Sequence, residues 1–214
     1  MAVLDEALTF FAELGAEFLT VKREGDSLAA IAREVGACSR CPLGATRTHA
    51  VPGEGAETPP ILFIGEGPGE TEDRFGRPFI GPAGELLTRI IEKMGFPRSE
   101  VFITNVVKCR PPGNRVPTPV EAAACRPFLD RQIRLLKPRV IVCLGKPATN
   151  FLLGAEYSIT KIRGTWLRHG EIPVMPTFHP SYILHQKERK AASEAKWQVW
   201  SDMERVQELL RTSP

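Results

Sequence analysis

The sequence lacks the patterns that mark several large classes of protein. Its 214 residues contain no run approaching the ~18 consecutive apolar side chains of a membrane span, so no transmembrane helix is expected. No basic run precedes the first apolar residues, so no secretory signal is expected either. Glycine has no fixed period, which excludes collagen, and internal repeats are absent. These absences predict a cytoplasmic protein with no membrane partner.

An excess of charge of one sign is also missing. The chain has 28 basic and 25 acidic residues, so the net charge is only +3, which neither requires nor opposes a nucleic-acid partner. Charged residues make up 25% and apolar residues 43% of the chain, which is typical of a folded globular protein and excludes a disordered one. The length favours a single domain, residues 1–214.

The cysteines form a spaced pattern. Without an export signal, disulfides are rare, and clustered cysteines more often serve metals or catalysis. Cys38 and Cys41 form a C-x2-C pair, and Cys109 and Cys125 follow after gaps of 67 and 15 residues. Four thiolates suffice for a structural zinc ion or a [4Fe–4S] cluster, and four unconnected buried thiols are the alternative. Cys143 lies in an apolar run and is expected in the core.

Strands alternate with helices along the chain. Short apolar runs, typical of strands buried on both faces, span 61–65, 101–107 and 140–145. Residues 172–178 are a fourth candidate strand, interrupted by prolines. Helical spacing or caps predict helices over 4–21, 28–35, 84–93, 118–136 and 194–211. This alternation predicts an α/β fold, a three-layer α/β/α sandwich around a central, mainly parallel four-stranded sheet.

Polar residues follow three of the predicted strands. In open α/β sheets, ligands bind beyond the carboxyl ends of the strands. A glycine-rich stretch at 65–70 follows the first strand, Asn105 lies near the end of the second, and His179 follows the last. We therefore expect these three ends to converge on one pocket. The glycine-rich stretch matches neither a Walker loop nor a full dinucleotide fingerprint, and a tight turn is its alternative interpretation.

Several side chains near these ends have both a chemical and a structural interpretation. A carboxylate beside the glycine-rich stretch is a candidate to position water, although acidic loop residues are usually only solvated. Phe79 is either a core residue or a platform for a flat ring. His179 is either a capped structural residue or a hydrogen-bond donor to developing negative charge.

The segment after His179 has an apolar tip followed by basic residues. Tyr182, Ile183 and Leu184 precede a charged run over 185–190. Such a pattern fits a wedge inserted into a DNA duplex with phosphate contacts beside it. A loop with a buried anchor and a solvated charge run is the alternative.

Four separated motifs and the four cysteines together resemble the family 4 uracil-DNA glycosylases, the iron–sulfur members of that superfamily. The motifs are GEGPGE at 65–70, GRPF at 76–79, TNVVKCRPP at 104–112 and HPS at 179–181. The resemblance covers residues 36–190. It implies a monomeric enzyme that flips uracil out of DNA and hydrolyses its N-glycosidic bond, leaving an abasic site.

The resemblance also implies a role for each site residue. Phe79 would stack on uracil, Asn105 would pair with its polar edge, and His179 would stabilise the departing anion. Other families of the superfamily have aspartate and tyrosine where this chain has Gly67 and Gly69. The implied residues are Glu66, Gly67, Glu72 and His179 for catalysis; Gly65, Gly69, Phe79 and Asn105 for uracil; Ser181, Tyr182, Ile183, Leu184 and Lys187 for DNA; and Cys38, Cys41, Cys109 and Cys125 for a structural [4Fe–4S] cluster.

The water-positioning carboxylate is the open point. Glu66, Glu70 and Glu72 are the candidates, and the family pattern favours Glu72, with Glu66 contributing partly through its backbone. Glu72 is also expected to supply the bulk that excludes the thymine methyl group.

Three alternatives to this function compete. A relative that traps the abasic sugar covalently carries an arginine-rich insertion with a histidine, and residues 108–116 contain no histidine. An iron–sulfur electron carrier would need only the cysteines. A uracil-binding module without chemistry would not require both Asn105 and His179.

Overall fold

Apolar runs form the centre of the sheet in a computed structural model that describes residues 26–212. β2 (Ile61–Gly65), β3 (Phe102–Asn105), β4 (Val140–Leu144) and β6 (Ile172–Thr177) are parallel, in the order β3-β2-β4-β6. Every residue of β2, β3 and β4 is buried, which explains why these strands read as continuous apolar runs. Each of the four expected strands is therefore present.

Two short antiparallel strands extend this sheet at its edges. β1 (Glu54–Gly55) pairs with β3, and β5 (Leu167–His169) pairs with β6, so the described residues form a mixed sheet of six strands. The expected number of four strands was wrong. β1 has two residues and β5 carries polar residues at an edge, so neither makes an apolar run that a sequence pattern detects.

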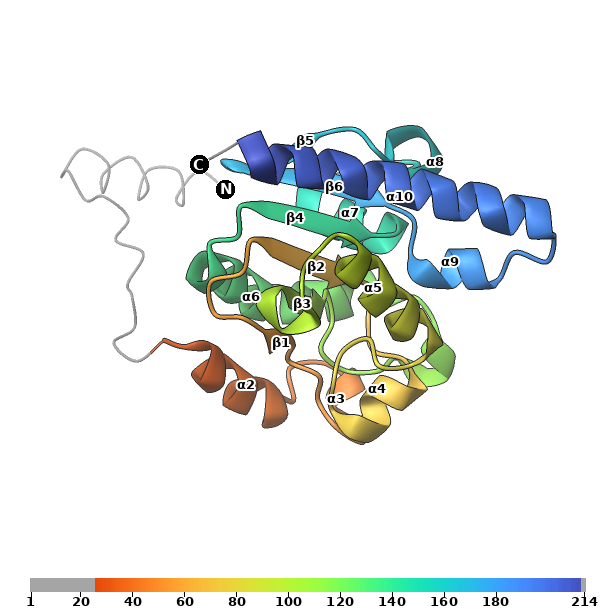
Figure 1. Ribbon diagram of the computed structural model, residues 1–214. Helices are drawn as coiled ribbons and strands as arrows, with labels where there is room; N and C mark the ends of the chain where they lie inside the picture. The colour runs from red at the N-terminus through yellow and green to blue at the C-terminus, as the bar shows by residue number, and fades with distance from the viewer. Residues whose placement is uncertain (1–25, 213–214) are drawn as a thin grey trace, which may run out of the picture.

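Helices cover both faces of the sheet, as Figure 1 shows. α6 (Pro119–Leu136) and α7 (Lys146–Leu153) pack on the face that carries Leu62 and Ile64. α5 (Pro82–Lys93) and α10 (Arg189–Thr212) pack on the opposite face, which carries Ile61 and Phe63. Alternate residues of β2 thus point to opposite layers, as the period of a strand requires.

The other helices are short, apart from α2 (Leu28–Gly36), whose first turn is capped by the Ser27 hydroxyl. The helix expected over 4–21 lies outside the described residues. No helix among residues 26–212 is long and apolar enough to cross a membrane. The remaining helical elements are α3 (Leu43–Thr46), α4 (Glu70–Phe75), α8 (Ile159–Ile162), α9 (Pro180–Leu184) and the 3-10 turns η1 (Arg98–Glu100) and η2 (Pro112–Asn114).

Candidate active site

The carboxyl ends of β2, β3 and β6 meet at one edge of the sheet and surround a pocket of about 670 Å³. The expected convergence of three strand ends is confirmed, because parallel strands place their carboxyl ends at the same edge. The predicted site residues that line the pocket are Glu66, Gly67, Gly69, Glu72, Phe79, Asn105, His179, Ser181 and Leu184. Gly65, Tyr182, Ile183 and Lys187 are not among its lining residues.

Asn105 presents an unused hydrogen-bond acceptor to this pocket. Asn105 is only 1% exposed. Its Oδ1 is the one buried side-chain polar atom without a hydrogen-bond partner within residues 26–212. Its backbone carbonyl is held by the Lys108 ammonium at 2.7 Å. A buried acceptor without a partner is destabilising, and native proteins seldom keep one without a functional reason. A ligand that brings an N–H group would satisfy it.

Gly65 allows the Phe79 ring and the Asn105 carboxamide to approach each other at the end of β2. A Cβ atom at Gly65 would overlap Asn105 Oδ1 and lie 2.5 Å from Phe79 Cζ. A glycine is therefore required here for close packing. Gly65 contributes to the pocket through this missing side chain, although it does not line the pocket.

Phe79 has a strained backbone. Its φ of +50° lies in the left-handed region, which disfavours a bulky residue by about 1–3 kcal/mol. Its ring is 6% exposed and its centroid lies 5.6 Å from that of His179. Such strain persists only when neighbouring contacts impose it.

His179 is held as a neutral ring with a defined tautomer. Its Nδ1 accepts a hydrogen bond from Ser181 N at 3.1 Å and lies 2.7 Å from Ser181 Oγ. Burial lowers the pKa of His179 to about 4, although the nearby Glu72 carboxylate opposes this shift. With Nδ1 accepting, the single ring proton is assigned to Nε2, which becomes a hydrogen-bond donor.

The carboxylates near the glycine-rich stretch differ in their contacts. Both Glu72 oxygens accept backbone hydrogen bonds, Oε1 from Ile80 N at 2.9 Å and Gly81 N at 2.8 Å, and Oε2 from Gly69 N at 3.2 Å. The Glu70 side chain is 78% exposed and pairs with Arg110. The Glu66 side chain has no hydrogen-bond or ion-pair partner within the described residues, and its burial raises the pKa of its carboxyl group. Glu66 is thus the lining carboxylate that is free to bind another group.

Glu72 also occupies the space beside Gly69. A Cβ atom at Gly69 would lie 2.8 Å from Glu72 Oε2. The expected surface loop over these acidic residues is in fact α4, whose first turn is closed by the hydrogen bond from Gly69 N to Glu72.

One residue of the expected DNA wedge points inward. Ile183 is only 3% exposed and packs against Phe178, Ala195 and Val199, so its expected place at an exposed tip was wrong. Leu184 is 46% exposed and lines the pocket, and Lys187 is exposed. The reason is that α9 turns through this segment, and neighbouring side chains on a helix point in different directions.

Tyr182 and Ser181 have local contacts in the same helix. The Tyr182 ring stacks on Phe178 at a centroid distance of 4.4 Å and remains 44% exposed. Ser181 bonds to His179 through both its N–H and its hydroxyl group. Ser181 thereby orients the histidine that caps the N-terminus of α9.

Four cysteines surround a second, small cavity. Cys38, Cys41, Cys109 and Cys125 all line it, although they come from the α2–α3 connection, the segment after β3 and the first half of α6. Two N–H groups point at their sulfurs, Arg47 Nη1 to Cys109 at 3.0 Å and Lys108 N to Cys125 at 3.3 Å. Cys143 is fully buried in β4 away from this cavity, as expected.

The donor set at this cavity consists of four thiols. Among residues 26–212, no group of three or more His, Cys, Asp or Glu side chains is arranged to hold a single metal ion. A polynuclear cluster places each thiolate on a different iron, so its ligands surround a volume instead of one point. Four thiols around one cavity, with N–H donors aimed at two sulfurs, fit such a group.

Several pocket-lining residues were not predicted. Asn114, Arg115 and His185 line the pocket edge, and Arg115 forms a bidentate ion pair with Glu121. His185, the first residue of the charged run over 185–190, is exposed. No local pattern marks these residues, because their place at the pocket depends on how η2 and α9 pack.

The chain is similar to a known protein family and to several individual proteins. A family model described as the uracil DNA glycosylase superfamily matches residues 52–204. A type-4 uracil-DNA glycosylase of Thermotoga maritima is 48% identical, covering 85% of this chain and 93% of the relative. One from Pyrobaculum aerophilum is 54% identical over 75% of this chain and 84% of the relative. Another from Sulfurisphaera tokodaii is 46% identical over 87% and 86%.

Proposed function

The chain belongs to the type-4 uracil-DNA glycosylases of the uracil-DNA glycosylase superfamily, and from this premise we propose that it excises uracil from DNA by hydrolysing the N-glycosidic bond. The buried, unpartnered Oδ1 of Asn105 is the observation that carries this proposal. Uracil presents an N3–H donor next to an O4 acceptor, and a carboxamide pairs with both. Cytosine presents the opposite pattern and would leave the buried amide unsatisfied.

The base lies between Phe79 and the polar groups in this proposal. The Phe79 ring offers a flat face on which any base can stack. The hydrogen bonds to Asn105 therefore select uracil over the other bases. Glu72, which fills the space beside Gly69, is the group proposed to exclude the thymine methyl. Extrusion of the base costs a few kcal/mol, least at a mispair.

His179 acts on the leaving group. The bond between the sugar C1′ and uracil N1 breaks, its electron pair stays on uracil, and the negative charge spreads to O2. A neutral imidazole with its proton on Nε2 donates a hydrogen bond to that oxygen and stabilises the anion. The sugar becomes electron-poor at C1′, and the oxygen of a water molecule completes the hydrolysis there as its proton leaves to a base.

A change at His179 tests this role through pH. The unfolded histidine titrates near pH 6.5, whereas the folded one has a pKa of about 4, so the unfolded state binds a proton first as the pH falls. The neutral His179 ring therefore contributes fully to the free energy of unfolding above pH 6.5. This contribution is lost as the pH falls from there through about 4. We expect His179→Asn to flatten the acid limb of a plot of Tm against pH and to lower excision about 10²-fold. A wild-type rate that titrates near pH 6.5 through His179 would contradict the neutral ring.

Glu66 is the proposed water-positioning residue, in place of the Glu72 favoured by the family pattern. The Glu72 side-chain oxygens already accept hydrogen bonds from three backbone N–H groups, whereas the Glu66 carboxylate lies at the pocket without a partner among residues 26–212. We expect Glu66→Gln to lower the single-turnover excision rate by about 10²-fold with little change in Tm. Glu70→Gln is the matched comparison, because Glu70 also lines the pocket but its exposed carboxylate pairs with Arg110. This variant should retain the wild-type rate. Equal rates for wild type and Glu66→Gln would move the role elsewhere.

Side chains of α9 and of the residues after it complete the proposed contact with DNA. Of the expected apolar tip at 182–184, Leu184 lines the pocket and is the proposed wedge, and Ser181, Tyr182 and Lys187 flank it. An apolar side chain that enters the gap left by a flipped base opposes its return.

The four cysteines that line the second cavity are the proposed ligands of a structural [4Fe–4S] cluster. When bound, the cluster would cross-link the α2–α3 connection, the segment after β3 and α6. Cys109 follows Asn105 by four residues, so the cross-link would also stabilise the end of β3.

Excision on a labelled oligonucleotide with one uracil, followed by alkaline cleavage of abasic sites, tests the function. Wild-type protein should cleave at uracil and leave a matched thymine oligonucleotide intact. No cleavage by folded, iron-loaded protein would overturn the proposal. A stable protein–DNA adduct on a denaturing gel would indicate covalent trapping of the sugar instead of turnover.

A further inference from the structure

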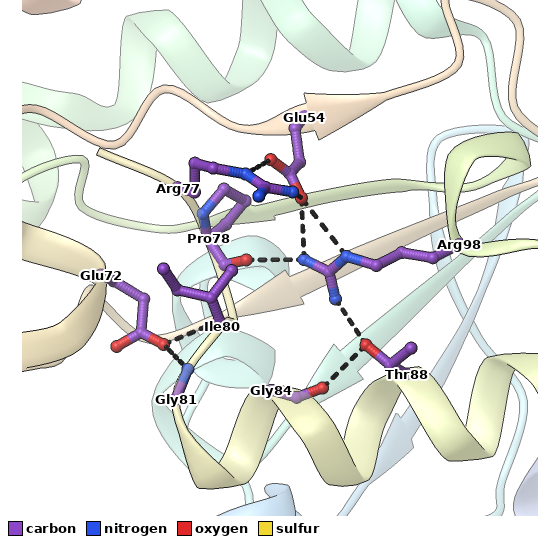
Figure 2. A network of polar contacts seen from close by, with 9 residues as sticks. All are labelled: Glu54, Glu72, Arg77, Pro78, Ile80, Gly81, Gly84, Thr88 and Arg98. Atoms are coloured by element: carbon purple, nitrogen blue, oxygen red, sulfur yellow. Dashed lines mark hydrogen bonds and ion pairs between the residues drawn. The ribbon is translucent and has the colours of Figure 1, made fainter. Parts of the chain in front are cut away.

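A network of polar contacts surrounds the segment that carries Phe79 (residues 77–81), as Figure 2 shows. Arg98, in η1, donates from Nη2 to the Pro78 carbonyl at 2.6 Å, immediately before Phe79. Glu72 accepts from Ile80 N and Gly81 N immediately after it. The strained Phe79 is thus held on both sides, by a guanidinium at one flank and a carboxylate at the other.

The same guanidinium joins two further elements. Arg98 Nη2 and Nε donate to Glu54 Oε1 of β1 at 3.0 and 3.3 Å, and Nη1 donates to Thr88 Oγ1 of α5 at 3.0 Å. The Thr88 hydroxyl in turn donates to the Gly84 carbonyl at 3.0 Å. Arg98 is therefore an anchor between the sheet edge, the first turns of α5 and the Phe79 segment.

The first turn of α5 packs directly on the Phe79 backbone. A Cβ atom at Gly84 would overlap both the carbonyl carbon and the carbonyl oxygen of Phe79. Only a glycine allows this approach, so the position of α5 and the conformation of Phe79 are linked. A guanidinium that binds α5 and Pro78 together preserves this arrangement.

Glu54 neutralises the anchor. The Arg98 side chain is 19% exposed and that of Glu54 27% exposed, so their ion pair is largely shielded from water. Arg77, which is 60% exposed, donates to the same carboxylate from the solvent side. The planar guanidinium of Arg98 donates to several acceptors at once, and the ammonium group of a lysine cannot reproduce this set of hydrogen bonds.

From this geometry we infer that Arg98, held by Glu54, is a positioning residue that sets the Phe79 ring for stacking on the base. Arg98 does not line the pocket and acts only through the Phe79 segment. The inference rests on the proposed function, since it assigns Phe79 to uracil stacking.

A double-mutant cycle separates this role from a general loss of stability. We expect Arg98→Met to lower kcat/KM for uracil excision about tenfold and to weaken inhibition by free uracil to a similar extent. In a Phe79→Ala background, Arg98→Met should change kcat/KM less than about twofold, because the ring it positions is gone.

Arg131→Met is the matched control. Arg131 is similarly buried, with 15% of its side chain exposed, and it also binds two carboxylates, Asp26 and Glu34, away from the pocket. Arg131→Met should lower Tm to a similar extent as is expected for Arg98→Met, but it should leave inhibition by free uracil unchanged. Arg98→Lys and Glu54→Gln serve as milder variants if Arg98→Met fails to fold. The effect of each on kcat/KM should likewise largely disappear in a Phe79→Ala background.

Two failures are distinguishable. Wild-type protein with no uracil excision would overturn the proposed function. Active wild-type protein in which the effects of Arg98→Met and Phe79→Ala multiply independently, or in which uracil inhibition is unchanged, would overturn the positioning role.

Discussion

Asn105→Ala is expected to lower kcat/KM for uracil excision by about 10²–10³-fold, because it removes the groups proposed to pair with N3–H and O4 of the base. The folded protein should tolerate the change. Asn105 Oδ1 is buried without a partner among residues 26–212, so the substitution removes an unsatisfied acceptor and breaks no hydrogen bond to that atom. We expect Tm to stay within about 2–4 °C of wild type, or to rise, since each kcal/mol corresponds to about that shift.

A matched control is available in α7. Asn150 is also an asparagine, and its carboxamide is satisfied, with Oδ1 accepting from Tyr157 N at 3.0 Å and Nδ2 donating to Glu156. Asn150→Ala should lower Tm and retain full excision. Single-turnover excision and thermal unfolding on both variants give opposite patterns if Asn105 reads the base. An Asn105→Ala variant that excises uracil at the wild-type rate would exclude that role.

Cys109→Ala is expected to abolish bound iron and to lower Tm by about 10 °C or more. Cys109 is buried beside the cavity shared with Cys38, Cys41 and Cys125, and removing one ligand breaks the proposed cross-link between three distant segments. Metal binding at such a site contributes directly to the free energy of folding, and each kcal/mol corresponds to about 2–4 °C in a chain of this size.

Cys143→Ala controls for the loss of a buried thiol. Cys143 is fully buried in β4 and does not line the cysteine cavity, so the variant should keep its iron and its visible absorption. Iron analysis, visible absorption and thermal unfolding compare the two variants. A Cys109→Ala protein without iron that keeps both the wild-type Tm and full activity would contradict a structural cluster.

The local elements of this protein were readable from short stretches of sequence. The runs at 61–65 and 140–145 are strands because every side chain in them is apolar, and Thr118 with Glu121 starts α6 because that pair closes a capping box. The convergence of Asn105 and His179 also followed, since parallel strands end at the same edge. The family resemblance could also be recognised from the sequence, because each of its motifs is a short continuous stretch.

Contacts between distant segments decided the rest. The antiparallel edge strands are too short and polar to leave a pattern, and the direction of Ile183 and Leu184 depends on the turn of α9. Glu66 and Glu72 are the same residue type six positions apart, yet within the described residues backbone N–H groups donate only to the side-chain carboxylate of the second.

By itself the sequence determined which segments become buried strands and capped helices, and which polar residues follow the strand ends. Only the tertiary structure decided which carboxylate is free, which apolar side chain faces the pocket edge and how Phe79 is held at φ +50° by Arg98 and Glu72. The physical reason is that strand and cap formation depend on neighbours within a few residues. The state of a pocket side chain depends instead on hydrogen-bond partners brought together by packing, such as Arg98 and Glu54, which lie 44 residues apart in the chain.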